Sequence, residues 1–350
     1  MWRAAIRVRA VQTDADRAAW HAYLLRAAGR TCFHEPAWCA AVAATFGHAA
    51  RHLIALRGTE PAGILPLMEV HSLIGGRMLV SVPYGTYGGI LADDPAARME
   101  LADEAMRLAD ERGARVLDLR SATPDVPGLD HVTGYLGFAR DLPQQADEVG
   151  ACLPKRARAA ARHARDRAGV VVRHDPQQAE LVWRLYCRSM RRIGSLNYPW
   201  RFFQELLARF AERAWVSVAW LGERALAGTI SFVHGDTLMP YILGADERVH
   251  CDGVANLLYW SVMERAVAAG LRRFDYGRSR ADNAGAVGFK KNQGFEPQPL
   301  GYQRYVPPGR RAPDLRPSSP RFTLARQIWQ RLPLAATRIA GAWLARSIPG

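Results

Sequence analysis

The 350-residue chain repeats itself at the scale of a whole domain. The stretch 113–121 (GARVLDLRS) resembles 270–279 (GLRRFDYGRS), and each follows a segment with the pattern of a helix. Upstream, 56–65 and 221–230 share an apolar strand, a polar turn with glycine and a second apolar strand, which is the pattern of a β-hairpin. Matched pieces in matched order over so long a period indicate a duplicated fold, not a solenoid.

Each copy predicts helices, a strand hairpin, a third strand, a long helix and another strand. The long helices are expected at about 97–112 and 254–269, each stopped by a glycine and followed by a short strand that ends in Asp118 or Asp275. Pro83-Tyr84 and Pro240-Tyr241 also correspond. This order predicts an α/β (α+β) fold with mixed sheets. The expected domains are a first copy at 1–150, a basic connector helix at 151–168, a second copy at 169–306 and a tail at 307–350.

Charge and cysteine content limit the classes of partner. A net charge of +14 suits nucleic acid, an anionic membrane face or phosphorylated substrates. The basic connector could meet an RNA backbone or could present a solvated face, and both remain open. Five widely spaced cysteines without a CxxC pair argue against disulfides and zinc, so no metal is expected, and they favour a reducing compartment. Neither a signal peptide nor a membrane-spanning apolar run is recognisable, which predicts a cytoplasmic protein.

Only three of the 47 basic residues are lysines, and two of them, Lys290 and Lys291, stand together in 288–295 (GFKKNQGF). An ammonium is a compact point donor, whereas guanidinium is a planar fork. A lysine pair in so arginine-rich a chain indicates a site where the fork does not fit. The first copy has no counterpart of this pair after Ser121, which predicts one active centre, in the second copy.

Six local patterns in order carry a resemblance over about 33–305. They are HEPAW at 34–38, SVPYGTYGG at 81–89, MRRIG at 190–194, NLLYW at 256–260, FDYGRS at 274–279 and FKKNQGF at 289–295. With the duplicated architecture, they resemble the FemAB-like family of tandem GNAT-fold acyltransferases, in the branch associated with exosortase and exopolysaccharide systems. The resemblance implies transfer of an acyl or aminoacyl group to an amine of a cell-envelope or exopolysaccharide precursor.

The resemblance also implies roles for particular residues. Lys290 would lie near the donor carbonyl with Phe289 beside it, and Arg192 would meet the phosphates of a nucleotide-linked acceptor. Asp275 joins Lys290 and Phe289 as a catalytic candidate. Further substrate-binding candidates are Tyr84, Tyr241, Tyr259, Arg278 and Lys291, although tyrosines at such positions also commonly belong to a core.

Two departures from the family pattern bear on the substrates. Cross-bridge enzymes carry a lysine shortly after the tryptophan that matches Trp38, where this chain has CAAV at 39–42, which weighs against a UDP-sugar peptide acceptor. The phosphate loop of GNAT enzymes survives only as HCDGVA at 250–255, with the spacing kept and the first residue changed. Gly253 and Ala255 could hold a donor phosphate at a helix N-terminus, or Asp252 could simply cap that helix. The donor, acyl-CoA or aminoacyl-tRNA (hence tRNA as a partner), stays open, and no permanently bound cofactor is expected.

The tail consists of a Pro/Arg/Ser linker at 307–320 and then apolar residues mixed with arginines. This composition suits a broken amphipathic helix on an anionic membrane surface or a segment packed on the protein's own body. The expected protein is a monomeric cytoplasmic N-acyltransferase, peripheral at the inner membrane if the tail binds there. The alternative is a non-catalytic scaffold that binds a nucleotide-linked glycan or RNA in a polymer-export complex.

Overall fold

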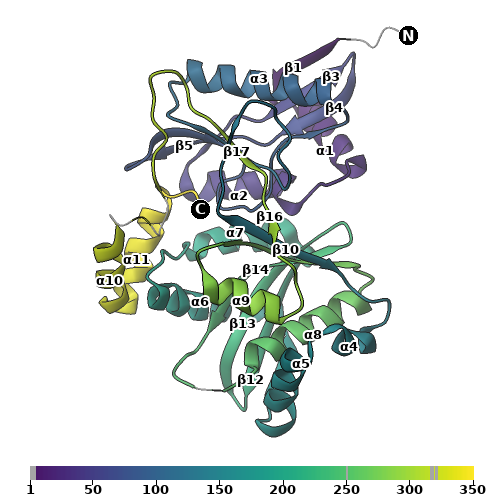
Figure 1. The fold of residues 1–350 in the computed structure, drawn as a ribbon, viewed down its shortest axis with the longest axis vertical. Coiled ribbons are helices and arrows are strands. Elements are labelled where there is room, and N and C mark those ends of the chain that lie inside the picture. Colours follow the sequence, from purple (N-terminus) through teal and green to yellow (C-terminus); the bar gives the residue numbers. More distant parts are fainter. Residues whose placement is uncertain (1–4, 250, 316–318, 320–321) are drawn as a thin grey trace. The chain divides into compact units, whose positions relative to one another are not determined.

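The computed structural model describes residues 5–249, 251–315, 319 and 322–350, and the chain divides into two compact units (Figure 1). Unit 1 comprises Met1–Thr133, Leu300–Pro320 and Trp343–Gly350, and unit 2 comprises Gly134–Pro299 and Arg321–Ala342. Both units are discontinuous in sequence, whereas the repeat by itself predicts contiguous domains.

The described residues of unit 1 form two sheets and three α-helices. Its strands are β1 (Ile6–Ala10), β2 (Ala49–Ala50), β3 (Leu53–Arg57), β4 (Glu60–Leu65), β5 (Met68–Ser72), β6 (Gly76–Val80), β7 (Leu91–Ala92), β8 (Leu117–Arg120), β9 (Asp130–His131) and β17 (Tyr302–Tyr305). Its helices are α1 (Asp14–Arg26), α2 (Pro36–Phe46) and α3 (Pro95–Glu111). The sheet orders are β1-β3-β4-β7 and β2-β5-β6-β8-β17-β9.

Helix α3 shows how the local sequence sets an element of unit 1. Asp94 caps its N-terminus by accepting a hydrogen bond from Ala97 N at 3.0 Å, and proline stands in the first turn, where a missing N–H costs nothing. Gly113, with a φ of 61°, follows its end. Leu101 and Ala105 on its buried face pack with the core formed over β3 and β4. The predicted helix at 97–112 is confirmed.

Unit 2 is built on a single sheet. Its strands are β10 (Tyr135–Asp141), β11 (Val171–His174), β12 (Ala214–Leu221), β13 (Arg224–His234), β14 (Thr237–Ala245), β15 (Arg273–Arg280) and β16 (Gln298–Pro299). Its helices are α4 (Val149–Cys152), α5 (Lys155–Arg162), α6 (Ala179–Ile193), α7 (Trp200–Phe210), α8 (Val254–Ala268), α9 (Ala284–Asn292) and α10 (Thr323–Arg331), and α11 (Leu334–Ala345) begins in it. The sheet order is β11-β12-β13-β14-β15-β10-β16.

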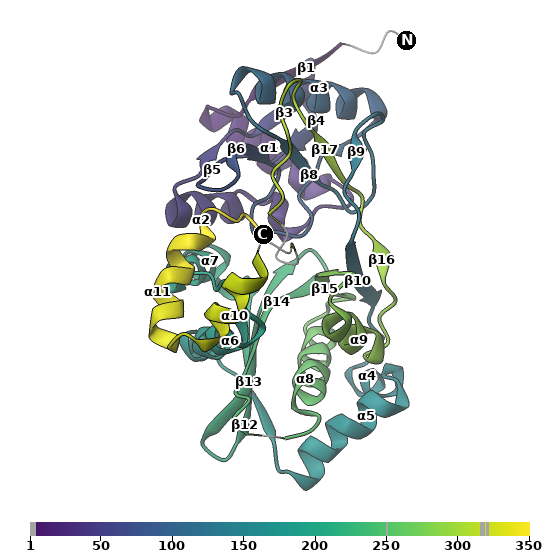
Figure 2. The same ribbon diagram turned by 60° about the vertical axis from the view of Figure 1, so that its left-hand side comes forward.

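Helices cover both faces of this sheet. Figure 2 shows α6 and α8 on opposite sides of β13, and both contact that strand. Helix α5, the observed form of the predicted connector, continues into a π-helical turn (His163–Arg167) and packs on α8. The strands alternate in direction from β11 to β14, while β14 and β15 run parallel. This is the mixed α/β fold that the sequence predicts.

One strand in a sheet of each unit lies next in sequence to the elements of the other unit. Strand β10, which follows the unit 1 elements, pairs antiparallel with β15 in unit 2. Strand β17, which follows the unit 2 elements, pairs antiparallel with β8 in unit 1, Tyr302 opposite Arg120. A repeat in the sequence shows which pieces are alike but not which sheet each strand joins. This exchange of strands between the two units therefore cannot be predicted from the repeat.

Candidate active site

The sheet of unit 2 opens between its two parallel strands. Only Thr237 pairs with Arg273 and Leu238 with Phe274, although β14 and β15 are nine and eight residues long. Beyond these pairs the two strands part, so their carboxyl-terminal halves are no longer hydrogen-bonded to each other. Ligands of open α/β sheets bind at the carboxyl ends of parallel strands. A ligand site is therefore expected at the second halves of β14 and β15.

A β-bulge marks each of these strands near the divergence. Ile230 pairs with Ile242 and Ser231 with Pro240, so Tyr241 is an extra residue on β14. The ring of Tyr241 packs against Phe202 and Phe232, with centroid distances of 6.4 and 5.9 Å. Because a bulged residue is left out of the ladder, the β14 backbone changes direction where it leaves β15.

The bulge on β15 is built by Asp275 and Gly277. Gly137 pairs with Arg278 and Ala139 with Asp275, so β15 carries one extra residue there, and Gly277 has a φ of 63°. The Asp275 carboxylate accepts a hydrogen bond from Gly277 N at 2.7 Å. Asp275 is the third residue of β15, so the expectation that the strand ends at this residue is wrong. The carboxylate fixes a left-handed step that glycine adopts without strain.

Lys290 reaches this bulge from α9. Its Nζ donates to the carbonyl oxygens of three consecutive residues, Tyr276 at 2.9 Å, Gly277 at 3.4 Å and Arg278 at 3.1 Å. The ammonium also lies 4.9 Å from the ring centroid of Phe138. In a regular strand successive carbonyls point to opposite sides, so the bulge is what lets three of them converge on one cation.

Burial lowers the pKa of Lys290 from its ordinary 10.5 to about 8, and the nearby Asp275 carboxylate opposes this shift. Desolvation penalises the charged form of a lysine, while the carbonyls and the carboxylate favour it. The neighbouring Lys291 is exposed. The two lysines of the pair thus occupy different environments, and only Lys290 is part of the bulge.

Aromatic rings pack beside the lysine, whose Nζ lies 5.8 Å from the ring centroid of Tyr276. Phe289 lies 5.9 Å from the ring of Tyr259, and Tyr259 lies 4.7 Å from the ring of Tyr276. Tyr259 and Tyr276 are buried, and burial raises the pKa of both phenols. The structure therefore brings Lys290, Phe289, Asp275 and Tyr259 together, with Tyr259 inside the core of unit 2.

Two predicted substrate-binding arginines of unit 2 lie apart from this core. The Arg278 guanidinium stacks 5.0 Å from the ring of Tyr135, while its carbonyl meets Lys290. Arg192, at the end of α6, pairs with Glu247 and is 60% exposed at the side chain. Arg192 has no contact with the lysine among those described, so its role toward an acceptor phosphate stays a prediction.

Gly253 stands at the N-cap of α8 with a φ of 81°, so the expectation that Asp252 caps this helix is wrong. A Cβ on Gly253 would lie 2.0 Å from the carbonyl oxygen of Ala160 on α5. The glycine is thus required by the close approach of α5. Donor-phosphate binding by Gly253 and Ala255 stays a prediction, and residue 250 of the same loop lies outside the described residues.

Tyr84 belongs to unit 1, where it is engaged by the end of the same chain. Its φ is 63°, its hydroxyl donates to Ala345 O at 3.1 Å and contacts His48 Nε2 at 2.9 Å, and its N–H donates to Pro349 O at 2.7 Å. Pro83-Tyr84 follows β6, whereas Pro240-Tyr241 lies inside β14. The matching dipeptides therefore occupy different backbone settings.

Sequence reasoning missed Arg120, which is buried in unit 1. Its guanidinium donates to Val82 O at 3.0 Å, to Pro349 O at 3.1 Å and to Gly350 O at 2.6 Å. The only hint in the sequence is the correspondence of 119–121 with 277–279. Pro349 and Gly350 of the same chain therefore lie against Arg120 and the loop after β6.

Sequence reasoning also missed buried polar groups beside the β15 bulge. Within the described part of the chain, Nε and Nη2 of Arg140, the hydroxyl of Tyr276 and the amide of Gln293 have no hydrogen-bond partner. Arg140 pairs with Phe274, next to Asp275, and its guanidinium lies 4.8 Å from the ring centroid of Phe295. Buried unsatisfied groups are few in folded proteins and often mark places where water or a ligand completes the network.

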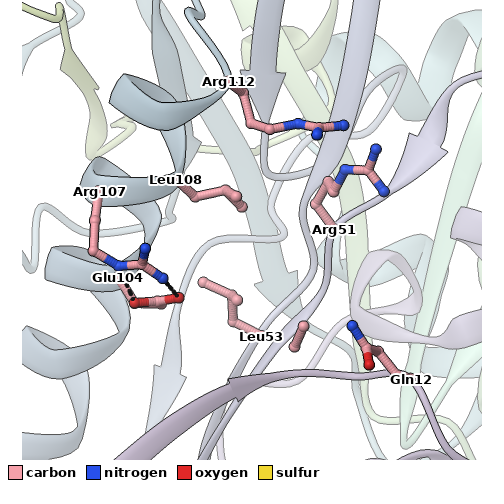
Figure 3. A pocket seen from close by; sticks show the side chains of 8 residues that line it. Gln12, Arg51, Leu53, Glu104, Arg107, Leu108 and Arg112 are labelled. Atoms are coloured by element: carbon pink, nitrogen blue, oxygen red, sulfur yellow. Dashed lines mark hydrogen bonds and ion pairs between the residues drawn. The ribbon is translucent and has the colours of Figure 1, made fainter.

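A cavity of about 290 Å³ lies in unit 1 between α3 and the β1–β3 edge (Figure 3). It is lined by Ala10, Gln12, Arg51, Leu53, Glu104, Arg107, Leu108 and Arg112. Its arginines are already paired, Arg107 with Glu104, and Arg51 and Arg112 with the buried Glu69. The cavity contains none of the predicted site residues.

Across the described residues, no cluster of three or more His, Cys, Asp or Glu side chains could hold a metal ion. The same residues include no helix that is long and apolar enough to cross a membrane.

A family model described as an acetyltransferase (GNAT) domain matches residues 154–291, inside unit 2. No curated protein matches the chain. The match covers α8, β15 and α9, and thus both catalytic candidates on α9. Acyltransferase chemistry is therefore supported for the second unit.

Solved structures extend the likeness to both units. FemX has a TM-score of 0.64 at 15% identity, with 85% of this chain and 97% of that chain covered. A tandem GNAT protein from the clavulanic acid biosynthesis pathway has a TM-score of 0.55 at 13% identity, with coverage of 86% and 98%. L-PGS from Bacillus licheniformis has a TM-score of 0.52 at 14% identity, with coverage of 98% and 100%. The chain thus shares the fold of these structures, a tandem GNAT protein among them, and its second unit matches the acetyltransferase (GNAT) domain.

Proposed function

We propose that unit 2 is an N-acyltransferase that moves an acyl group from acyl-CoA to a primary amine, with Lys290 at the reacting carbonyl. The observation that carries the proposal is the convergence of three β15 carbonyls and one half-buried ammonium just beyond the divergence of β14 and β15. The GNAT match over 154–291 supports acyl-CoA as the donor class.

The amine nitrogen attacks the thioester carbonyl, the C–S bond breaks, and amide and thiol form while the amine loses one proton. Negative charge gathers on the carbonyl oxygen in the transition state, and a preorganised cation there lowers the barrier. Lys290 has all three N–H groups on backbone carbonyls, of which the contact with Gly277 O at 3.4 Å is the longest. A substrate oxygen would replace that contact, with the other two holding the ammonium in place.

The acceptor we propose is an amine on a precursor of a cell-envelope or exported polymer, at the cytoplasmic side. A similar structure described as the C-terminal domain of a putative lysylphosphatidylglycerol synthetase supports an envelope-related acceptor, because that product is a phospholipid. The exposed Arg192 at the end of α6 would meet phosphates of a nucleotide-linked acceptor by exchanging its partner Glu247. The branch associated with exosortase and exopolysaccharide systems is part of this proposal.

Thermal shift with acetyl-CoA, longer acyl-CoAs and charged tRNA tests the donor. Stabilisation by an acyl-CoA is expected, since a ligand that binds only the folded protein raises its melting temperature. A melting-temperature shift with charged tRNA alone would mean that the donor is aminoacyl-tRNA and not acyl-CoA. No shift with any of these ligands would favour the non-catalytic scaffold.

Release of free thiol from acyl-CoA in the presence of amines tests the lysine. We expect Lys290→Ala to lose at least 100-fold in rate, on the scale of removing one oxyanion donor. Lys155→Ala, which removes the third lysine of the chain, exposed at the start of α5, is the control and should retain the parent rate. Equal rates for the two variants would show that Lys290 takes no part in the acyl transfer.

A further inference from the structure

The chain from residue 315 to its last residue carries six arginines and neither aspartate nor glutamate. Asp314 is the last acidic residue. This one-sided charge covers the segment that forms α10 and α11. It favours a partner with negative charge.

Helix α11 has two faces of different character. Thr337, Gly341 and Ala345 recur at every fourth position and are buried. A Cβ on Gly341 would lie 2.4 Å from Asn197 Oδ1, so α11 packs tightly against Asn197 at this position. Ile339 and Trp343 lie two positions further along, about 200° around a helix of 3.6 residues per turn, and are 75% and 57% exposed.

Helix α10 repeats the arrangement. Trp329 is buried, whereas Leu324 and Ile328, one turn apart, are 67% and 52% exposed. Figure 2 shows α10 and α11 beside α6, and α10 contacts that helix. Each helix therefore exposes one pair of large apolar side chains at i, i+4 spacing, which places both members of a pair on the same face.

The helix pair is held in place on α6 by polar contacts. Gln330 Nε2 donates to Arg192 O at 2.8 Å and Arg191 Nη1 donates to Leu332 O at 3.0 Å. The Arg338 guanidinium lies 4.9 Å from the ring centroid of Trp183. The apolar pairs are thus presented by docked helices, and their exposure is a property of the fold.

We propose that α10 and α11 are a docking face for an anionic membrane surface. Leu324, Ile328, Ile339 and Trp343 enter the boundary between headgroups and acyl chains, and the exposed Arg331 and Arg346 meet lipid phosphates. Helices of nine and twelve residues are too short to span a bilayer, which needs about 20 residues. They suit a position in the interfacial plane. A tryptophan at the edge of an apolar face is typical of that depth.

Co-sedimentation of the full chain with vesicles tests the proposal. Vesicles of phosphatidylcholine with about a third phosphatidylglycerol should pellet the protein, and pure phosphatidylcholine should do so at least tenfold less. Binding should weaken in 0.5 M salt, because screening reduces the attraction between arginines and lipid phosphates. The double variant Ile339→Glu/Trp343→Glu should lose at least tenfold in binding.

The matched control is Leu25→Glu/Val171→Glu, which changes side chains of similar exposure, 68% and 55%, on α1 and β11. It should bind vesicles like the parent. A second variant, Arg331→Glu/Arg346→Glu, leaves the apolar pairs intact and should lose binding to the anionic vesicles. Thermal midpoints equal to the parent's confirm that the variants are folded.

Three outcomes would overturn the proposal. One is absence of binding to either vesicle, and another is equal loss of binding in the control variant. The third is self-association in sedimentation equilibrium that the Ile339→Glu/Trp343→Glu variant abolishes, which would assign the face to a second copy of the chain. None of these depends on acyl transfer, so the proposed function stands or falls separately.

Discussion

At the scale of single residues, the candidate site depends on one lysine and on a backbone irregularity that holds it. The scarcity of lysine in the sequence predicts that 290–291 is special, and the structure separates the pair into one half-buried and one exposed ammonium. The pattern could not predict the bulge at Gly277. A single extra residue leaves no periodic trace in a strand of eight residues.

The lowered pKa of Lys290 predicts a pH-dependent cost in stability. Burial holds this pKa at about 8, against 10.5 in the unfolded chain. Between these values the unfolded lysine keeps a proton that the folded one releases, so this residue's contribution to the free energy of unfolding improves as pH rises from 8 to 10.5. Below pH 8 the full penalty applies, about 3 kcal/mol.

Urea unfolding of the parent and of Lys290→Met at pH 7 and pH 10 measures this effect. The parent should gain stability relative to the variant as pH rises, because only the parent carries the buried ammonium. The same comparison for Lys291→Met should show no such change. Parallel pH curves for the parent and Lys290→Met would contradict the lowered pKa.

The left-handed backbone of Gly277 predicts opposite effects for two glycine substitutions. Gly277→Ala should lower the free energy of unfolding by about 1–2 kcal/mol, because a Cβ disfavours a φ of 63°. Gly288→Ala, in α9 with open space around its Cβ position, should raise it by about 0.5–1 kcal/mol. Urea unfolding of the two variants checks both signs, and a neutral Gly277→Ala would argue against the bulge.

At the scale of secondary-structure elements, the sequence predicts helices and hairpins better than it predicts strand partners. Pro95 and Gly113 bound α3, and Gly270 follows α8, so these helices lie within two residues of their expected limits. The hairpins are β3–β4 and β12–β13. The divergence of β14 from β15 depends on contacts with other elements, which no local pattern contains.

Strand β5 carries an ion cluster whose loss should destabilise unit 1. The buried Glu69 carboxylate pairs with Arg51 at 2.9 Å, Arg112 at 2.8 Å and Arg77 at 3.2 Å. Burial opposes its ionisation, but hydrogen bonds from Arg112 and Arg51 lower the pKa of Glu69. Removing one partner of a buried network leaves the others uncompensated.

Glu69→Gln should therefore lower the free energy of unfolding by about 3 kcal/mol. Glu104→Gln is the matched control, because its partner Arg107 lies on the same exposed helix face, and it should cost less than about 0.5 kcal/mol. Urea unfolding at neutral pH measures both. Similar losses for the two variants would mean that burial adds nothing to the Glu69 cluster.

At the scale of the whole molecule, the duplicated sequence predicts two similar halves, and the fold exchanges a strand between them. β17 stands between β8 and β9 in unit 1, so a chain cut after 133 or 150 lacks the centre of that part of the sheet. Unpaired strand edges are prone to aggregation.

The fragment 1–133 should therefore aggregate or fail to show a cooperative unfolding transition. The same fragment with 300–306 joined to its end by a Gly/Ser linker should be soluble and unfold cooperatively, because β17 is restored. Size-exclusion chromatography and thermal unfolding compare the two. A well-folded 1–133 fragment would show that β17 is dispensable.

The exchanged strand also means that β8 is synthesised on the ribosome long before its partner β17. About 180 residues separate Arg120 from its partner Tyr302, which takes on the order of 10–40 s at about 5–20 residues per second. During that interval the nascent first half exposes an open strand edge between β8 and β9. The protein then depends on chaperones, or on the distance between neighbouring ribosomes, to keep newborn chains from pairing with one another before each has made its own β17.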